Sequence, residues 1–111
     1  MREPSEGRKR ILALQQRALR FSNHINQTYP TGLINHPSRV VWDQLVRAAD
    51  GASNNLVEAD GASSSADFLN KMRIALREAK ESKACLSKVR MAPLANADRA
   101  RELEPLRRPM A

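Results

Sequence analysis

The stretch from residue 66 to residue 90 constrains the fold more than any other part of the chain. Apolar or small side chains recur in it at alternating intervals of four and three residues: Phe68, Met72, Ala75, Ala79, Ser82, Leu86 and Val89. In a helix this spacing places them on one narrow face, as in helices that pack into bundles. Successive residues are about 100° apart around a helix, so four cations fall almost opposite this face: Arg73, Arg77, Lys80 and Lys88. The sequence therefore predicts a long helix over residues 65–91 with an apolar and a basic face.

Two further helices are predicted before this one, over residues 8–27 and 38–59. The segment between them contains Pro30 and Pro37, and each proline disfavours helix in the residue before it. Ser38 is predicted to cap the second helix. The inward residues are predicted to be Ile11, Leu14, Ala18, Phe21 and Ile25 in the first helix, and Val41, Leu45, Ala48, Ala52, Asn55 and Ala59 in the second.

One glycine marks a weak point inside the second helix and another marks its end. Gly51 costs about 1 kcal/mol relative to alanine inside a helix, and its Asp, Ser and Asn neighbours compete for backbone hydrogen bonds. A break at this point is therefore one alternative. Gly61 is predicted to end the helix in a left-handed conformation, and the segment from Ser64 to Asp67 to begin the third helix.

A short fourth helix is predicted over residues 96–106, where Ala97, Ala100 and Leu103 form an apolar edge. Short connections between helices favour antiparallel neighbours. We therefore expect an all-α fold, an antiparallel up-down-up-down four-helix bundle that forms a single domain over residues 1–111. Residues 1–6 and 107–111 are expected to be loose.

The charge balance favours polyanionic partners. The chain has 19 Lys and Arg against 12 Asp and Glu, a net charge of +7, and such a protein attracts nucleic acid at low salt. A basic balance also occurs in proteins that bind no nucleic acid. The single cysteine, Cys85, suits a reducing compartment. With no export signal and no membrane-spanning run in the sequence, a cytoplasmic protein without membrane contact is expected.

No enzyme signature is present in the sequence. His24, His36 and Cys85 are scattered and lack metal-ligand spacing, and no phosphate-binding glycine loop or nucleophile motif occurs. Glu58, Glu78 and Glu81 are better explained by surface ion pairs than by acid–base catalysis. We therefore expect a non-enzymatic protein with no catalytic residue, cofactor or metal.

The basic face of the third helix is the candidate nucleic-acid site. Its cations suit phosphate contacts, and Arg17 and Arg20 of the first helix could extend the patch. The alternative is a solvated outer helix face. The candidate residues are Arg77, Lys80, Lys88, Arg73, Arg17 and Arg20. Separately, Ile74, Cys85 and Trp42 lie off the apolar stripes, which favours a second contact surface and a homo-oligomer.

Three motifs carry a family resemblance: Gln44-Leu-Val-Arg-Ala-Ala49, Asn54-Asn-Leu-Val-Glu58, and Asp67-Phe-Leu-Asn-Lys-Met-Arg-Ile-Ala-Leu76 with Glu81. They resemble the bacterial four-helix bundle proteins encoded in intervening sequences of 23S ribosomal RNA genes. The family is related to the accessory variability determinant proteins of diversity-generating retroelements. The resemblance implies an antiparallel four-helix bundle, a tendency to form homopentamers, and no known catalysis.

The resemblance also implies roles for residues and partners. Asn55, Glu58, Arg73 and Glu81 match polar positions of the family, and are candidates for a polar set that links the second and third helices. In that role Arg73 would be a structural partner and not a phosphate ligand. The expected function is a non-enzymatic, oligomeric protein that binds RNA or DNA phosphates. The alternative is a scaffold that docks on a protein such as a reverse transcriptase, without nucleic-acid contact.

Overall fold

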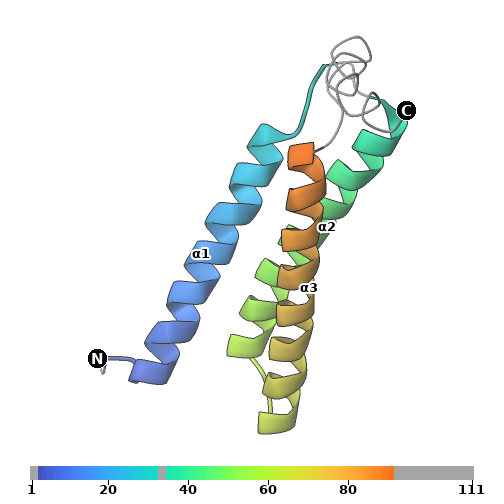
Figure 1. Cartoon of the computed structure of the whole chain (residues 1–111). Helices are drawn as coiled ribbons and strands as arrows, with labels where there is room; N and C mark the ends of the chain where they lie inside the picture. The colour runs from blue at the N-terminus through green and yellow to red at the C-terminus, as the bar shows by residue number, and fades with distance from the viewer. Residues whose placement is uncertain (1–2, 33–34, 92–111) are drawn as a thin grey trace, which may run out of the picture.

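The computed structural model of the chain describes residues 3–32 and 35–91. They form three helices, α1 (Glu6–Thr28), α2 (His36–Asp60) and α3 (Ser65–Met91), shown in Figure 1. The predicted helices over 8–27, 38–59 and 65–91 are confirmed, and their ends differ by at most two residues. The predicted fourth helix over 96–106 lies outside the described residues. The described part of the chain is all-helical.

Capping side chains define where the helices begin. Asn35 caps α2, because its side chain accepts a hydrogen bond from the Ser38 amide at 2.9 Å. The prediction that Ser38 is the cap is therefore wrong. The reason is Pro37, which fits the first helical turn, where no amide hydrogen is needed. Ser64 does cap α3 as predicted, since its hydroxyl accepts from the Asp67 amide at 3.0 Å.

The two glycines of α2 behave differently from expectation. The helix runs unbroken through Gly51, where a Cβ atom would lie 3.2 Å from Cγ of Glu78. The missing side chain thus lets α3 approach α2 closely at this point. Gly61 ends α2 at φ −94° and ψ 13°, so the predicted left-handed conformation is wrong. Its N–H still reaches the Val57 carbonyl at 3.4 Å, so the last turn closes without a left-handed residue.

Helix α2 is the centre of the molecule. It packs closely against both α1 and α3, whereas the described backbones of α1 and α3 do not approach each other closely and instead border a shared space. The buried face of α2 is accordingly broad. It comprises Ser38, Leu45, Ala48, Ala49, Ala52, Ser53, Leu56 and Ala59.

The core lies at the end of the molecule where α1 ends, α2 begins and α3 ends. Leu45 is 0% exposed and packs with the buried residues Ile25 and Cys85. Half-buried apolar side chains surround this group: Phe21, Val41, Trp42, Val46, Leu86 and Val89. Burial of these side chains is the main force that joins the three helices.

The orientation of α3 corrects one expectation. Cys85, predicted to lie off the apolar stripe on a second contact surface, is 3% exposed and belongs to the core. Ala75, Ser82 and Cys85 are the buried residues of α3, while Ala79 of the predicted stripe is exposed. The reason is that α3 turns a different sector of its surface toward α2. The other half of the predicted stripe borders the space between α1 and α3.

The buried thiol of Cys85 is expected to react slowly. Burial, together with the charge of Glu81, raises its pKa, so thiolate is scarce at neutral pH and access is blocked. We expect a disulfide reagent such as DTNB to label the folded chain about a hundredfold more slowly than the urea-unfolded chain. Absorbance at 412 nm measures both rates at the same pH. Equal rates in the two states would show that Cys85 is not buried in solution.

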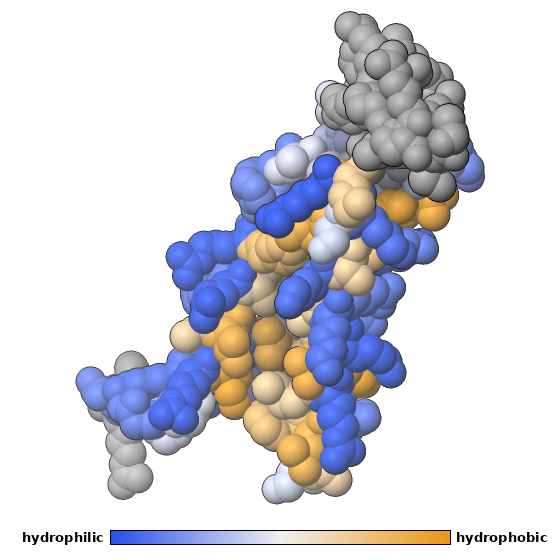
Figure 2. Space-filling model, in the orientation of Figure 1, coloured by the Kyte–Doolittle hydropathy of each residue, from blue (hydrophilic) through white to orange (hydrophobic). Residues whose placement is uncertain are grey.

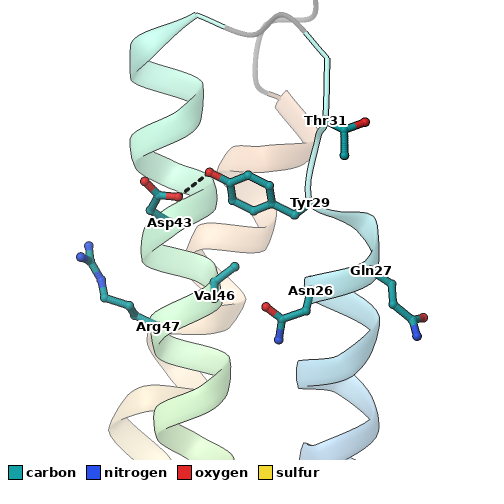
Figure 3. A pocket seen from close by; sticks show the side chains of 7 residues that line it. All are labelled: Asn26, Gln27, Tyr29, Thr31, Asp43, Val46 and Arg47. Carbon is teal, nitrogen blue, oxygen red and sulfur yellow. Dashed lines mark hydrogen bonds between the residues drawn. The ribbon is translucent and has the colours of Figure 1, made fainter.

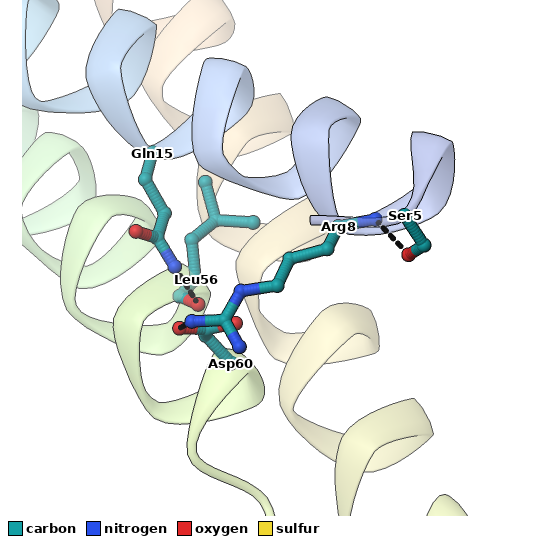
Figure 4. Close-up of polar contacts among 5 residues, drawn as sticks. All are labelled: Ser5, Arg8, Gln15, Leu56 and Asp60. Carbon is teal, nitrogen blue, oxygen red and sulfur yellow. Dashed lines mark hydrogen bonds and ion pairs between the residues drawn. The ribbon is translucent and has the colours of Figure 1, made fainter. Parts of the chain in front are cut away.

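The contact between α1 and α2 is a polar seam with a regular spacing. Arg8 bonds to Asp60 at 3.2 Å, and the Gln15 amide donates to the Leu56 carbonyl at 3.1 Å (Figure 4). Farther along, Ser22 donates to the Asp50 carboxylate and Tyr29 to the Asp43 carboxylate. The four donors recur every seven residues, which is nearly two helical turns. We call these four contacts the polar seam.

Candidate nucleic-acid interface

The basic face of α3 points into solvent. Arg73, Arg77, Lys80 and Lys88 are all exposed, and none forms an ion pair with a described residue. They lie roughly opposite the buried residues Ala75 and Ser82, and Lys88 lies within one turn of the buried Cys85. The face therefore offers unneutralised cations to a partner.

The two predicted cations of α1 are also exposed. Arg20 donates from Nε to the Gln16 carbonyl at 3.4 Å in its own helix. Arg17 borders the space between α1 and α3 and forms no ion pair within residues 3–32 and 35–91. The structure thus places Arg17 on the far side of this space from the α3 cations. Any extension of the basic face onto α1 crosses that space.

An apolar groove runs between α1 and α3, and α2 forms its floor. It consists of two adjoining hollows of about 410 and 300 Å³ that share Ala18, Ala52 and Ala79. Figure 2 shows this groove as an orange band between blue surfaces. Two large side chains in it remain open to solvent, Leu14 at 42% and Leu76 at 56% exposed. The other large apolar residues lining it are Phe21, Leu56, Met72 and Leu86.

The four residues of the predicted polar set are not bonded to one another. Asn55 donates to the Gly51 carbonyl at 2.8 Å within α2, and Glu58 pairs with Lys71 of α3 at 2.8 Å. Arg73 and Glu81 are exposed, and neither forms an ion pair within the described ranges. The polar link between α2 and α3 therefore runs through Glu58 and Lys71. The bond to Glu58 raises the pKa of Lys71.

A polar pocket beside Tyr29 has no counterpart among the predicted sites. Tyr29 donates to Asp43 Oδ1 at 2.5 Å (Figure 3). Its ring also meets Trp42 edge-on, with ring centres 6.0 Å apart. Pro30 and Pro37 lie between Tyr29 and Trp42 in the sequence and interrupt the helical spacing. No repeating interval therefore relates the two aromatic residues. One sequence feature pointed to this contact: the only tyrosine and the only tryptophan lie on either side of the segment that contains Pro30 and Pro37.

The Tyr29 hydroxyl is expected to titrate late. Its hydrogen bond to Asp43, and to a lesser degree burial and the Asp43 charge, raise its pKa above the ordinary 10.0, while Arg39 opposes the shift. The pKa of Tyr29 is higher in the folded chain than in the unfolded chain. The hydrogen bond to Asp43 therefore stabilises the fold fully at pH values below the pKa of the unfolded chain. This stabilisation is lost as the pH rises through the folded pKa. Tyrosinate absorbance near 295 nm measures the titration.

The change Asp43→Asn provides the control for this titration. It removes the carboxylate that favours the protonated hydroxyl, so the pKa of Tyr29 should fall toward its ordinary value. Tyr29 is the only tyrosine, so the absorbance change reports on it alone. A wild-type pKa at or below the ordinary value would contradict the hydrogen bond.

Two classes of site are not found in the described part of the chain. Residues 3–32 and 35–91 contain no group of three or more His, Cys, Asp or Glu that could hold a metal ion. None of the three helices there combines the length and the apolarity that crossing a membrane requires.

These features define a small all-helical protein with a basic outer helix face and an apolar groove. A comparison with protein families matches residues 10–108 to the family described as 23S rRNA-intervening sequence protein. The chain therefore belongs to the 23S rRNA-intervening sequence protein family. Comparisons with curated proteins and with solved structures gave no match. The relation to proteins of diversity-generating retroelements stays a prediction.

Proposed function

We propose that this chain is a non-enzymatic, oligomeric protein that binds RNA or DNA through the phosphates, with α3 as the main contact. The observation that carries the proposal is the outward face of α3. Its four cations are exposed and lack ion-pair partners among the described residues. Phosphate contacts of this kind supply most of the affinity of non-specific nucleic-acid binding. The net charge of +7 adds long-range attraction.

A mobility-shift titration at two salt concentrations tests this proposal. A structured RNA and a duplex DNA are each titrated with the full chain at about 50 and about 200 mM salt. Binding should weaken steeply at the higher salt, because each phosphate contact releases condensed counterions. The proposal is refuted if neither nucleic acid is retained at the lower salt concentration.

We further propose that residues 96–106 form the fourth helix of the bundle and cover the groove. The family match extends to residue 108 and so includes this segment. The α3 side of the groove, from Met72 to Leu86, is about 21 Å long, and an 11-residue helix about 16 Å, at the usual rise per residue. The predicted apolar edge of the segment suits the apolar groove.

The change Leu103→Asp tests the fourth helix. It places a charge on the predicted apolar edge, so the groove should lose its cover, bind a hydrophobic dye such as ANS, and lower the unfolding temperature by several degrees, about 4–8 °C per kcal/mol lost. The matched change Val57→Asp alters a side chain that is 58% exposed and does not line the groove. It should have little effect. Equal behaviour of the two variants would argue against a covered groove.

The oligomeric state is proposed from the family resemblance, which implies a pentamer. Light scattering at micromolar concentration should give a multiple of the 12.4 kDa chain mass. A monomer would refute this part of the proposal. A cytoplasmic location is proposed with it, because the single cysteine, Cys85, is free and suits a reducing compartment.

A second function, docking on a protein partner such as a reverse transcriptase, is favoured by a different observation. Leu19 at 52% and Val57 at 58% exposed border a small hollow between α1 and α2 whose other lining residues are uncharged. Such an uncharged surface with two exposed apolar side chains suits a protein partner better than a phosphate backbone. Under this alternative, charge reversal on α3 would leave the activity intact, whereas Leu19→Asp would abolish it.

A further inference from the structure

The pocket beside Tyr29 is large enough for a small planar ligand. It has a volume of about 580 Å³ and opens to the surface between the end of α1 and the middle of α2. Asn26, Gln27 and Thr31 line it from the α1 side, and Asp43, Val46 and Arg47 from α2. A volume of this size lies within the range of ligand-binding pockets.

The Tyr29 ring is held in place before any ligand arrives. Its backbone N–H donates to the Ile25 carbonyl at 3.0 Å, and its hydroxyl is fixed on Asp43 at 2.5 Å. The edge-on contact with Trp42, at 65° between the ring planes, restrains the ring further. An aromatic ring fixed at both ends is a preorganised surface for stacking a flat ligand, because little conformational entropy remains to be lost.

Two side chains of the pocket, Asp43 and Asn26, offer hydrogen-bond acceptors to a ligand edge. The Tyr29 hydroxyl donates its proton to Oδ1 of Asp43. The other carboxylate oxygen of Asp43 has no hydrogen bond to a described residue. Asn26 donates one amide N–H to the Ser22 carbonyl at 3.0 Å, and its amide oxygen accepts no hydrogen bond from a described residue. A complementary ligand therefore presents N–H donors on its edge. Guanine carries adjacent N1–H and N2–H donors, whereas uracil has a single N–H between two carbonyls.

A cation at the rim of the pocket provides a contact for the phosphate group of a ligand. Arg47 is exposed at the α2 side of the pocket and forms no ion pair within the described ranges. A guanidinium binds phosphate with two parallel hydrogen bonds. Asp43 repels phosphate, so the base edge belongs beside Asp43 and the phosphate at Arg47.

We propose that this pocket binds one unpaired guanine of an RNA loop, stacked on Tyr29 with its edge at Asp43 and its phosphate at Arg47. The inference rests on the proposed nucleic-acid binding and adds a base-reading site to it. Proteins commonly read single-stranded RNA in this way, by stacking a base on an aromatic side chain and bonding its edge. The pocket would give the protein a preference that phosphate contacts alone cannot give.

The experiment compares two RNA hairpins that share one stem. One has a loop of seven uridines, and the other has a guanosine at the middle of that loop. Because Trp42 is the only tryptophan and touches Tyr29, its fluorescence reports occupancy of the pocket during titration. The wild-type protein should bind the guanosine loop about tenfold more tightly, the usual value of one bidentate base contact. Its Trp42 emission should change with that loop.

Three variants test which side chains produce the preference for the guanosine loop. Tyr29→Ala removes the stacking surface and Asp43→Asn the double acceptor, and each should reduce the guanosine preference to about twofold or less. Arg47→Ala removes the phosphate contact, so it should weaken the binding of both loops and leave the preference in place. Tyr29→Phe keeps the ring and should retain most of the stacking. The loop-free stem, as a duplex, should bind all variants within about twofold of wild type, apart from the lost charge in Arg47→Ala.

The outcomes separate the pocket from the proposed function. If the duplex stem is retained but wild type binds both loops equally, the pocket proposal is overturned and the proposed function stands. The same holds if Tyr29→Ala keeps the preference or if Trp42 emission is unchanged at saturation. If no RNA is retained, both proposals fall together.

Discussion

Replacing Leu45 with alanine is expected to lower the free energy of unfolding by about 3 kcal/mol. Leu45 is 0% exposed and sits where α2 meets both Ile25 of α1 and Cys85 of α3. Truncation removes buried methyl groups and leaves a cavity that three helices would have to close. A loss of this size is a large share of the stability of a small domain, about 5–15 kcal/mol. Urea unfolding followed by circular dichroism measures it.

Val57→Ala is the matched control for this change. Val57 lies in the same helix but is 58% exposed, so little burial is lost and the stability should stay within about 0.5 kcal/mol of wild type. If Leu45→Ala cost less than about 1 kcal/mol, the three helices would not share a core at this residue.

Reversing Arg77 and Lys80 to glutamate is expected to weaken nucleic-acid binding at low salt by at least about tenfold. Both side chains are exposed on the basic face of α3 and have no ion-pair partner among the described residues. Reversal removes two phosphate contacts and adds two repulsive charges. The slope of log affinity against log salt should become shallower by about two, because fewer counterions are released.

The double change Lys9→Glu and Arg10→Glu gives the same shift in net charge elsewhere. Both residues are exposed near the start of α1. The ion pairs of Lys9 with Glu3 and Glu6, at 3.4 and 3.5 Å, are solvent-exposed and contribute little to stability. This variant should lose less than about threefold in affinity. Equal losses in the two variants would mean that net charge, and not the α3 face, decides binding.

The helices themselves could be predicted from the sequence because their signals are local. The alternation of four and three residues, with Ser64 before Asp67, placed α3 at residues 65–91. Proline and glycine positions bounded the other helices to within two residues. The capping of α2 was predicted wrongly because Asn35 and Ser38 are both good caps, and Pro37 between them decides for Asn35.

The packing of α3 could not be predicted from its periodicity. An apolar stripe shows which side of a helix faces inward, but not which part of that side meets which neighbour. In α3 one part meets α2 through Ala75 and Cys85, and the other part, with Met72 and Leu86, borders the groove. Cys85 was therefore assigned to the wrong surface.

The polar contacts could not be predicted from the sequence either, for a related reason. Asn55 and Glu58 were grouped with Arg73 and Glu81, yet each bonds to a nearer group, the Gly51 carbonyl and Lys71. Long polar side chains have many possible partners, and backbone geometry selects one. The exposure of the α3 cations, by contrast, follows from helical spacing alone, and this part of the candidate site was predictable.

The polar seam between α1 and α2 also limits how these two helices can move. Helices joined only by interdigitated apolar side chains can find a second arrangement after a shift of one turn. Here the donors from Arg8 to Tyr29 share one interval, so a slide of a single turn separates all four pairs at once. Residues inserted between Tyr29 and Asn35 would therefore bulge outward and leave the register of α1 on α2 unchanged. These contacts, and not the length of the connection, therefore set the alignment of the two helices.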